Sequence, residues 1–347
     1  MDIVTHGLAS LAIARGFFPR AGKAAMAGSV LAGTIANVDW LSYCFGPSAY
    51  LAWHHTYLHS ILAALLIPAI LSAIPLKAIV PKHMPAPGDV SAGQNLRGRL
   101  FPTAFLLLFC AALLHIAMDA CQSTGVTLFW PFSSTRFAAD WLPRIDPWIL
   151  TILILTIAFP ELLRLVSSEI GAKDKGPRGQ TGAIVGLVLI FVYVGARGVL
   201  HSNVLAMMNA RTFHGETPRR VSAFPGALSL LTWHGVAETE TALNEIEVDA
   251  TAGSTFDPDT SLRLFKPEDS AALDAARDTA TARRFLVAAR IPKASVEKNE
   301  TGYVVILRDL SYAARGDTGR EVAAVIELDP NKRVTSEELV WARELRR

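Results

Sequence analysis

Three pairs of ionisable side chains stand four residues apart in the apolar first half of the chain. They are Asp2 with His6, His55 with His59, and His115 with Asp119. Residues four apart on a helix share one face, so each pair can offer two donors to one ion or water molecule. Asp39 and His54 are further donors in this half. Because ionisable groups in membrane-spanning segments are costly, such a cluster indicates a functional site.

Imidazole and carboxylate groups are the usual protein ligands of zinc and of comparable divalent ions. Six or more such donors predict one to three metal ions, with additional carboxylates that orient the ligands. We expect zinc, with manganese and iron as alternatives. A divalent ion activates water and polarises a phosphoryl or carbonyl oxygen, so the predicted chemistry is hydrolysis. The candidate donors are the three pairs together with Asp39 and His54.

The composition favours a membrane protein. Of the 347 residues, 51% are hydrophobic and 18% are charged, whereas soluble proteins carry roughly 25% charged residues. Residues 1–200 hold 14 Lys and Arg against 9 Asp and Glu, and residues 201–347 hold 19 against 22. A polar second domain (201–347) therefore follows an apolar first domain (1–200). The three cysteines exclude a disulfide scaffold, and a net charge of +2 argues against nucleic-acid binding.

The apolar half contains four stretches that reach the roughly 20 residues needed to cross a membrane. These run over about 57–76, 101–120, 147–166 and 182–200. Two weaker helical segments, about 5–18 and 21–42, precede them. The predicted fold class is therefore mainly α: a multi-pass transmembrane bundle of five or six helices, followed by a C-terminal domain.

The positive charges predict the orientation of these helices. Eleven Lys and Arg lie in the connections around 15–23, 77–99 and 164–178, and two lie in the connections 43–56 and 121–146. By the positive-inside rule the first set is cytoplasmic. The candidate ligands then all lie at the outer ends of their helices, although the rule takes no account of histidines.

The polar half alternates apolar and polar side chains in short runs. Residues 303–307 and 322–328 are typical of strands, and about 269–289 has a helical pattern. We expect an extracytoplasmic α+β domain over 201–347. It shows no arrangement of residues that indicates catalysis.

The candidate ligands also have structural interpretations. His115 and Asp119 can form a hydrogen bond that packs two helices together. Asp39 can cap a helix end, and residues 2–6 can form an N-terminal cap. The histidines of 54–59 can face lipid headgroups at the membrane surface. These alternatives stay open at the level of sequence.

Four sequence blocks follow a family pattern in order along the chain. They are DIVTHG (2–7), ANVD (36–39), HHTYLHS (54–60), and HIAMD (115–119) followed by TG (124–125), WPFS (130–133) and DPW (146–148). Over about residues 1–165 the chain resembles the YdjM-like, predicted membrane-bound metal-dependent hydrolases. The family is more distantly similar to zinc-dependent phospholipase C and single-strand nucleases. The resemblance implies ester hydrolysis and the metal ligands His6, Asp39, His54, His59, His115 and Asp119.

The chain departs from the family pattern at informative positions. Asn37 replaces the first carboxylate of a P-D-x-D motif, and His55 replaces an arginine. The family pattern pairs His54 with His59, whereas helical spacing pairs His55 with His59. Both pairings stay open, and so does an altered metal, an altered substrate or a loss of activity.

The sequence thus predicts a membrane-bound metal-dependent hydrolase of the cell inner membrane. It would cleave a phosphoester or other ester, including phospholipid-derived ones, at the outer membrane–water interface, with membrane lipids as partners. An activated water is the nucleophile, and Asp119 or Asp39 accepts its proton. One alternative is a non-catalytic metal-binding assembly protein, which the loss of a carboxylate at Asn37 favours. The other is a metal or ion transporter, against which the apolar inner halves of the helices argue.

Overall fold

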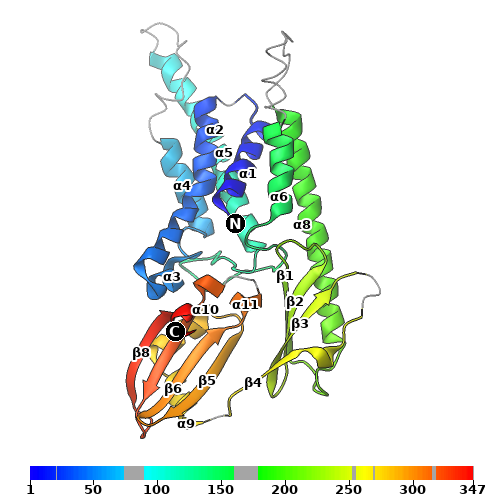
Figure 1. Ribbon diagram of the computed structural model, residues 1–347. Helices are drawn as coiled ribbons and strands as arrows, with labels where there is room; N and C mark the ends of the chain where they lie inside the picture. Colours follow the sequence, from blue (N-terminus) through cyan, green and yellow to red (C-terminus); the bar gives the residue numbers. More distant parts are fainter. Residues whose placement is uncertain are drawn as a thin grey trace. The chain divides into compact units, whose positions relative to one another are not determined.

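The computed structural model describes residues 1–20, 22–73, 90–159, 179–251, 255–268, 270–314 and 318–346. The chain forms two compact units (Figure 1). The first unit comprises Met1–Asp39 and His55–Ala196, and the second comprises Trp40–His54 and Arg197–Arg347.

The first unit is helical. Its elements are α1 (Ile3–Phe17), α2 (Lys23–Thr34), the start of a 3-10 segment (Ile35–Phe45), α4 (Ile61–Ala73), α5 (Val90–Ala120), α6 (Pro147–Leu153) with a π turn (Ile154–Ala158), and the first half of α8 (Gln180–Asn209). Helix α1 begins where the carboxylate of Asp2 accepts hydrogen bonds from the amides of Val4 and Thr5. Helix α1 contacts α2, α5 and α6, and α2 and α4 both contact α5.

Two helices of the described part of the chain are long and apolar enough to cross a membrane. They are Phe101–Ala120 within α5 and Gln180–Asn209. Three shorter apolar helices accompany them: Ile3–Phe17, Ile61–Ala73 and Pro147–Ile157. Of the five or six predicted membrane helices, the described residues thus support two by length and composition.

The expected span 57–76 differs from the structure because residues 54–60 form turns, and the helix begins only at Ile61. The last residues of this span, most of the second half of 147–166, and the basic connections at 77–89 and 164–178 lie outside the described residues.

One face of α8 is apolar and exposed. Phe191 is 82% exposed, and Val188, Val192 and Val199 are exposed on the same helix. Contiguous apolar surface of this kind marks contact with another apolar phase. This is consistent with α8 as a membrane-spanning helix.

The second unit contains two four-stranded antiparallel sheets with helices packed on them. One sheet has the order β1 (Arg220–Pro225), β2 (Thr232–Glu238), β3 (Ala242–Asp249) and β4 (Leu262–Phe265); the other has the order β5 (Pro292–Asn299), β6 (Gly302–Asp309), β7 (Val322–Leu328) and β8 (Val334–Trp341). Helices α9 (Ala271–Arg277) and α10 (Ala280–Ala288) pack against β6, β7 and β8. The expected strands 303–307 and 322–328 lie in β6 and β7, and the expected helical region contains α9 and α10. The α+β character of the C-terminal region is thus confirmed.

Each sheet has its own hydrophobic core. Val204 and Met208 of α8 pack with Trp233 of the first sheet, whereas Phe285 of α10 packs with Val305 of the second. Helix α3 (Pro47–Trp53), which belongs to the second unit, contacts β8. Figure 1 shows α3 beside the last strand.

Candidate metal centre

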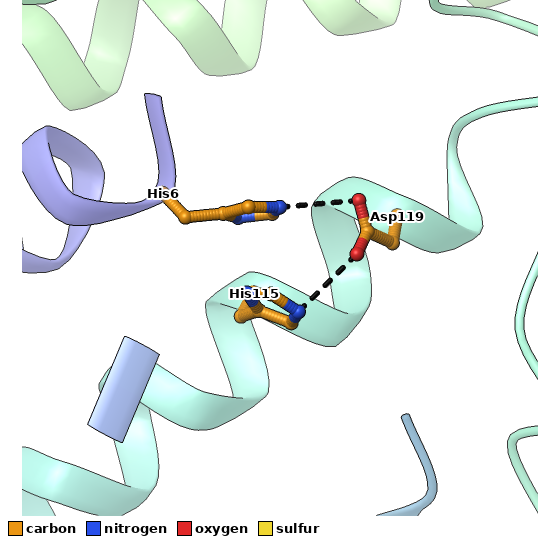
Figure 2. Close-up of side chains that lie close together, drawn as sticks. All are labelled: His6, His115 and Asp119. Atoms are coloured by element: carbon orange, nitrogen blue, oxygen red, sulfur yellow. Dashed lines mark hydrogen bonds and ion pairs between the residues drawn. The ribbon is translucent and has the colours of Figure 1, made fainter. Parts of the chain in front are cut away.

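The last two turns of α5 carry the centre of the site. His115 and Asp119 lie one turn apart, and Nε2 of His115 is 3.2 Å from Oδ2 of Asp119. Helix α1 contributes His6, whose Nε2 is 3.2 Å from Oδ1 of the same carboxylate. Figure 2 shows the two imidazole rings facing the two oxygens of Asp119. All three side chains are buried, and the α-amino group of Met1 is also hydrogen-bonded to Oδ1.

The turn before α4 contributes two more imidazoles. Nε2 of His59 lies 3.1 Å from Oδ2 of Asp119 and 3.1 Å from Nε2 of His115. The ring of His55 stacks on the ring of His59 at a centroid distance of 4.3 Å. Two groups of donors therefore share Asp119, namely His6–His115–Asp119 and His55–His59–Asp119, each with its ligand atoms within 4.8 Å of one another.

Three of these histidines are oriented through the other ring nitrogen. Nδ1 of His115 lies 2.7 Å from the carbonyl oxygen of Gly33, and Nδ1 of His55 lies 2.9 Å from that of Gly125. Because a carbonyl oxygen only accepts, each of these Nδ1 atoms carries the proton and Nε2 presents its lone pair. Nδ1 of His59 lies 3.1 Å from Oδ2 of Asp39. A metal-binding histidine is normally fixed in this way.

The donor geometry fits a divalent ion. A tetrahedral ion with bonds of 2.0–2.1 Å separates its donor atoms by about 3.3 Å, close to the 3.1–3.2 Å found among His59, His115 and Asp119. Nε2 of His115 presents a lone pair, and so does Nε2 of His59 in the tautomer that directs Nδ1–H to Asp39. Within the described residues, the buried Oδ2 of Asp119 accepts no hydrogen bond. A cation between these atoms would satisfy all of them, and the sharing of Asp119 allows two ions.

Comparison with known protein families identifies the family of this chain. The model of the YdjM inner membrane protein family matches residues 1–204. The chain belongs to this family. The match includes every member of both donor groups and confirms the predicted resemblance. No curated protein and no solved structure matches the chain significantly, and the more distant similarity to phospholipase C and nucleases is not shown.

The predicted ligands occupy three kinds of position: within a donor group, behind a donor, or in the second unit. His6, His59, His115 and Asp119 come together in the donor groups. Asp39, in the 3-10 segment, lies behind His59 rather than in either group. Its Oδ2 accepts a hydrogen bond of 2.7 Å from the backbone amide of His55 and is the atom that faces Nδ1 of His59.

The structure distinguishes His54 from His55, the two residues between which the sequence left the partner of His59 open. The ring of His54 stacks on Tyr50 at 4.6 Å within the second unit, whereas His55 joins the donor group. The helical spacing that favoured His55 is not the reason, because residues 54–60 form turns. His55 has a φ of 58°, a left-handed conformation that is uncommon for residues other than glycine, although histidine is among those that adopt it more often. Its backbone carbonyl accepts from the amide of Thr127 at 3.2 Å, which helps to hold this conformation.

Two glycines complete the site: Gly125, which the family pattern includes, and Gly33, which the sequence did not indicate. A Cβ on Gly33 would lie 1.7 Å from Oγ of Ser10, so only glycine lets α2 approach α1 closely enough for its carbonyl to reach His115. Gly125 has a φ of 64°, and a Cβ there would lie 2.7 Å from the carbonyl oxygen of Phe137. Nothing in the local pattern distinguishes Gly33 from other glycines in the same half, because its role lies in its backbone carbonyl.

Proposed function

We propose that this protein is a membrane-bound, metal-dependent hydrolase of phosphoester or other ester bonds. The observation that supports the proposal is the convergence of two groups of histidines on one buried carboxylate, Asp119. When bound, a divalent ion lowers the pKa of water and polarises a phosphoryl or carbonyl oxygen.

The residues of the chain divide this work. The carbonyls of Gly33 and Gly125 keep His115 and His55 in the tautomer that binds metal. Asp119 belongs to both donor groups, so we assign it to metal binding. Asp39 lies outside both groups, on the Nδ1 side of His59, and is therefore the carboxylate that we assign to orient His59.

The substrate class follows from the membrane setting. The family is one of inner membrane proteins, and α5 carries His115 and Asp119 in the last turns of an apolar helix. We propose that the shorter apolar helices packed on α5 lie in the membrane with it, and that the charge bias places the site at the outer surface. An ester linkage just below the lipid headgroups would meet the site at this depth, so a phospholipid-derived ester is the proposed substrate.

Metal content tests the proposal first. Elemental analysis of the detergent-purified protein should give near-stoichiometric zinc, manganese or iron, and the amount should fall in His115→Ala and in His59→Ala. A folded wild-type protein that holds no metal and takes up none on titration would refute the proposal.

Turnover is the second step of the test. The metal-loaded protein should hydrolyse phosphoesters in lipid vesicles, and Asp39→Asn, which weakens the orientation of His59, should lower this activity. Hydrolysis of soluble substrates alone would contradict the lipid assignment. Metal retention with no turnover on either substrate class would favour the non-catalytic assembly protein.

A further inference from the structure

A segment of the second unit interrupts the sequence of the first unit between two residues of the metal centre, Asp39 and His55. The chain leaves the first unit after Asp39 and returns to it at His55, and residues 40–54 between them belong to the second unit. We call residues 40–54 the docked segment. Both of its ends are peptide bonds to residues of the site. A hydrogen bond of 2.7 Å from the His55 amide to the Asp39 carboxylate joins the two residues that flank the docked segment.

An aromatic cluster holds the docked segment within the second unit. The ring of Tyr43 lies 4.6 Å from the ring of Trp341, at the end of β8, and the ring of Tyr50 lies 5.5 Å from it. Tyr50 and Trp341 are buried, together with Val322 of β7. Buried aromatic side chains of this size dominate the packing energy of the contacts that they make.

Two arginines of the second unit add to this attachment. Arg320 lies over the ring of Trp40 at 5.5 Å, and Arg343 lies over the ring of Tyr43 at 5.9 Å. Both distances are within the range of cation–π attraction. The docked segment is thus contacted at Trp40, Tyr43 and Tyr50 by residues that belong to the second sheet or lie between or after its strands.

The docked segment has little internal structure to order it. It consists of the end of a 3-10 stretch and the seven residues of α3. Helices this short are not stable alone, so packing must supply their order. The two residues at its ends are also demanding, because His55 has a φ of 58° and Asp39 must reach both the His55 amide and His59.

We propose that the C-terminal β domain is a positioning element of the metal centre, and that Trp341 is its main positioning residue. Trp341 orders the docked segment, and the order of this segment holds Asp39 and His55 at the donor groups. This inference rests on the proposed metal centre. It gives the second unit a role in a site to which its own sheets contribute no ligand among the described residues.

Cobalt titration of the full-length, detergent-purified protein tests the inference, with visible absorption as the readout of affinity and ligand geometry. Trp341→Ala should weaken Co²⁺ binding on the order of 10-fold, as the loss of a ligand's supporting contacts does, and should change the absorption spectrum. Trp341→Phe keeps an aromatic ring in the cluster, so its Co²⁺ affinity and absorption spectrum should stay close to those of the wild type. Tyr43→Ala perturbs the docked segment rather than the sheet and should act in the same direction.

Phe285→Ala is the matched control. Phe285 is a buried aromatic residue of α10 in the core of the same sheet, and it is not part of the Trp341 cluster. It should destabilise the second unit and leave Co²⁺ binding unchanged.

The outcomes separate the two proposals. A wild-type protein that binds no Co²⁺ would refute the proposed function itself. Wild-type binding that is unchanged in Trp341→Ala and Tyr43→Ala would overturn the positioning role and leave the metal centre intact. A loss in Phe285→Ala equal to that in Trp341→Ala would also overturn it, because general destabilisation would then explain both.

Discussion

Asp39 provides the sharpest test of the geometry of the metal centre. The sequence makes it a candidate ligand, whereas the structure places its Oδ2 2.7 Å from the His55 amide and 3.1 Å from Nδ1 of His59. These contacts are those of a carboxylate that orients a ligand. We therefore expect substitutions of Asp39 to weaken metal binding in a graded way and not to abolish it.

The magnitude follows from the two contacts. Loss of an orienting partner costs 10–100-fold in metal affinity, which corresponds to about 1.4–2.7 kcal/mol. Asp39→Asn keeps an oxygen acceptor and loses the charge that makes such a contact strong, so we expect a loss of about 10-fold. Asp39→Ala removes the oxygen that faces both the His55 amide and Nδ1 of His59, and we expect metal affinity to fall about 100-fold.

Competition with a chromophoric chelator measures these affinities in the detergent-purified protein. Asp146→Asn is a control with a matched change of charge. Asp146 is a buried carboxylate of the same unit that accepts from the amides of Trp148 and Ile149 at the start of α6. Asparagine caps a helix as well as aspartate does, so we expect the variant to lose the contact of Oδ2 with the Tyr193 hydroxyl, about 1 kcal/mol, and to keep its metal affinity.

Two results would refute the assignment of Asp39. Unchanged affinity in Asp39→Ala would show that the carboxylate does not orient His59. Complete loss of metal from a folded Asp39→Asn protein would show that Asp39 is a direct ligand, since the amide can replace an orienting oxygen but not an anionic ligand.

Three further predictions concern other parts of the molecule. His55→Ala should lower the metal content measured by elemental analysis, whereas His54→Ala should leave it unchanged; the reverse would restore the family pairing. Gly33→Ala should lower the free energy of unfolding by about 1–3 kcal/mol through overpacking, measured by thermal unfolding, and should lower metal affinity; Gly28→Ala on the same helix, with its nearest contact at 3.7 Å, should be neutral or stabilising. Glu321→Gln breaks a buried carboxylate's bidentate contact with an arginine and should cost about 1–3 kcal/mol in thermal unfolding without loss of metal.

Local periodicity was sufficient for much of the fold. The alternation of side chains predicted β6 and β7, and the apolar runs predicted the two long helices within α5 and α8. Of the four predicted full spans, two are matched by helices of sufficient length among the described residues. The span 57–76 begins later than predicted because residues 54–60 form turns, whose position depends on contacts with a distant segment: the amide of Thr127 donates to the carbonyl of His55.

The metal centre likewise combines positions set by local spacing with positions set by tertiary packing. His115 and Asp119 are close because they lie four apart on one helix, and helix geometry makes this a property of the sequence. The positions of His6, His59 and His55 around them depend on how α1, α4 and the turn pack against α5. That packing requires Gly33 and Gly125, whose essential atoms are backbone carbonyls present in every residue.

The sequence by itself determined the chemical type of the donors, the apolar setting and the family to which the chain belongs. Only the tertiary structure decided that His55 rather than His54 joins the donors, that Asp39 lies behind His59, and that residues 40–54 pack with the second unit. The physical reason is the range of the interactions. Residue type and helical spacing are local properties, whereas the contacts that choose between neighbouring histidines join segments distant in the chain.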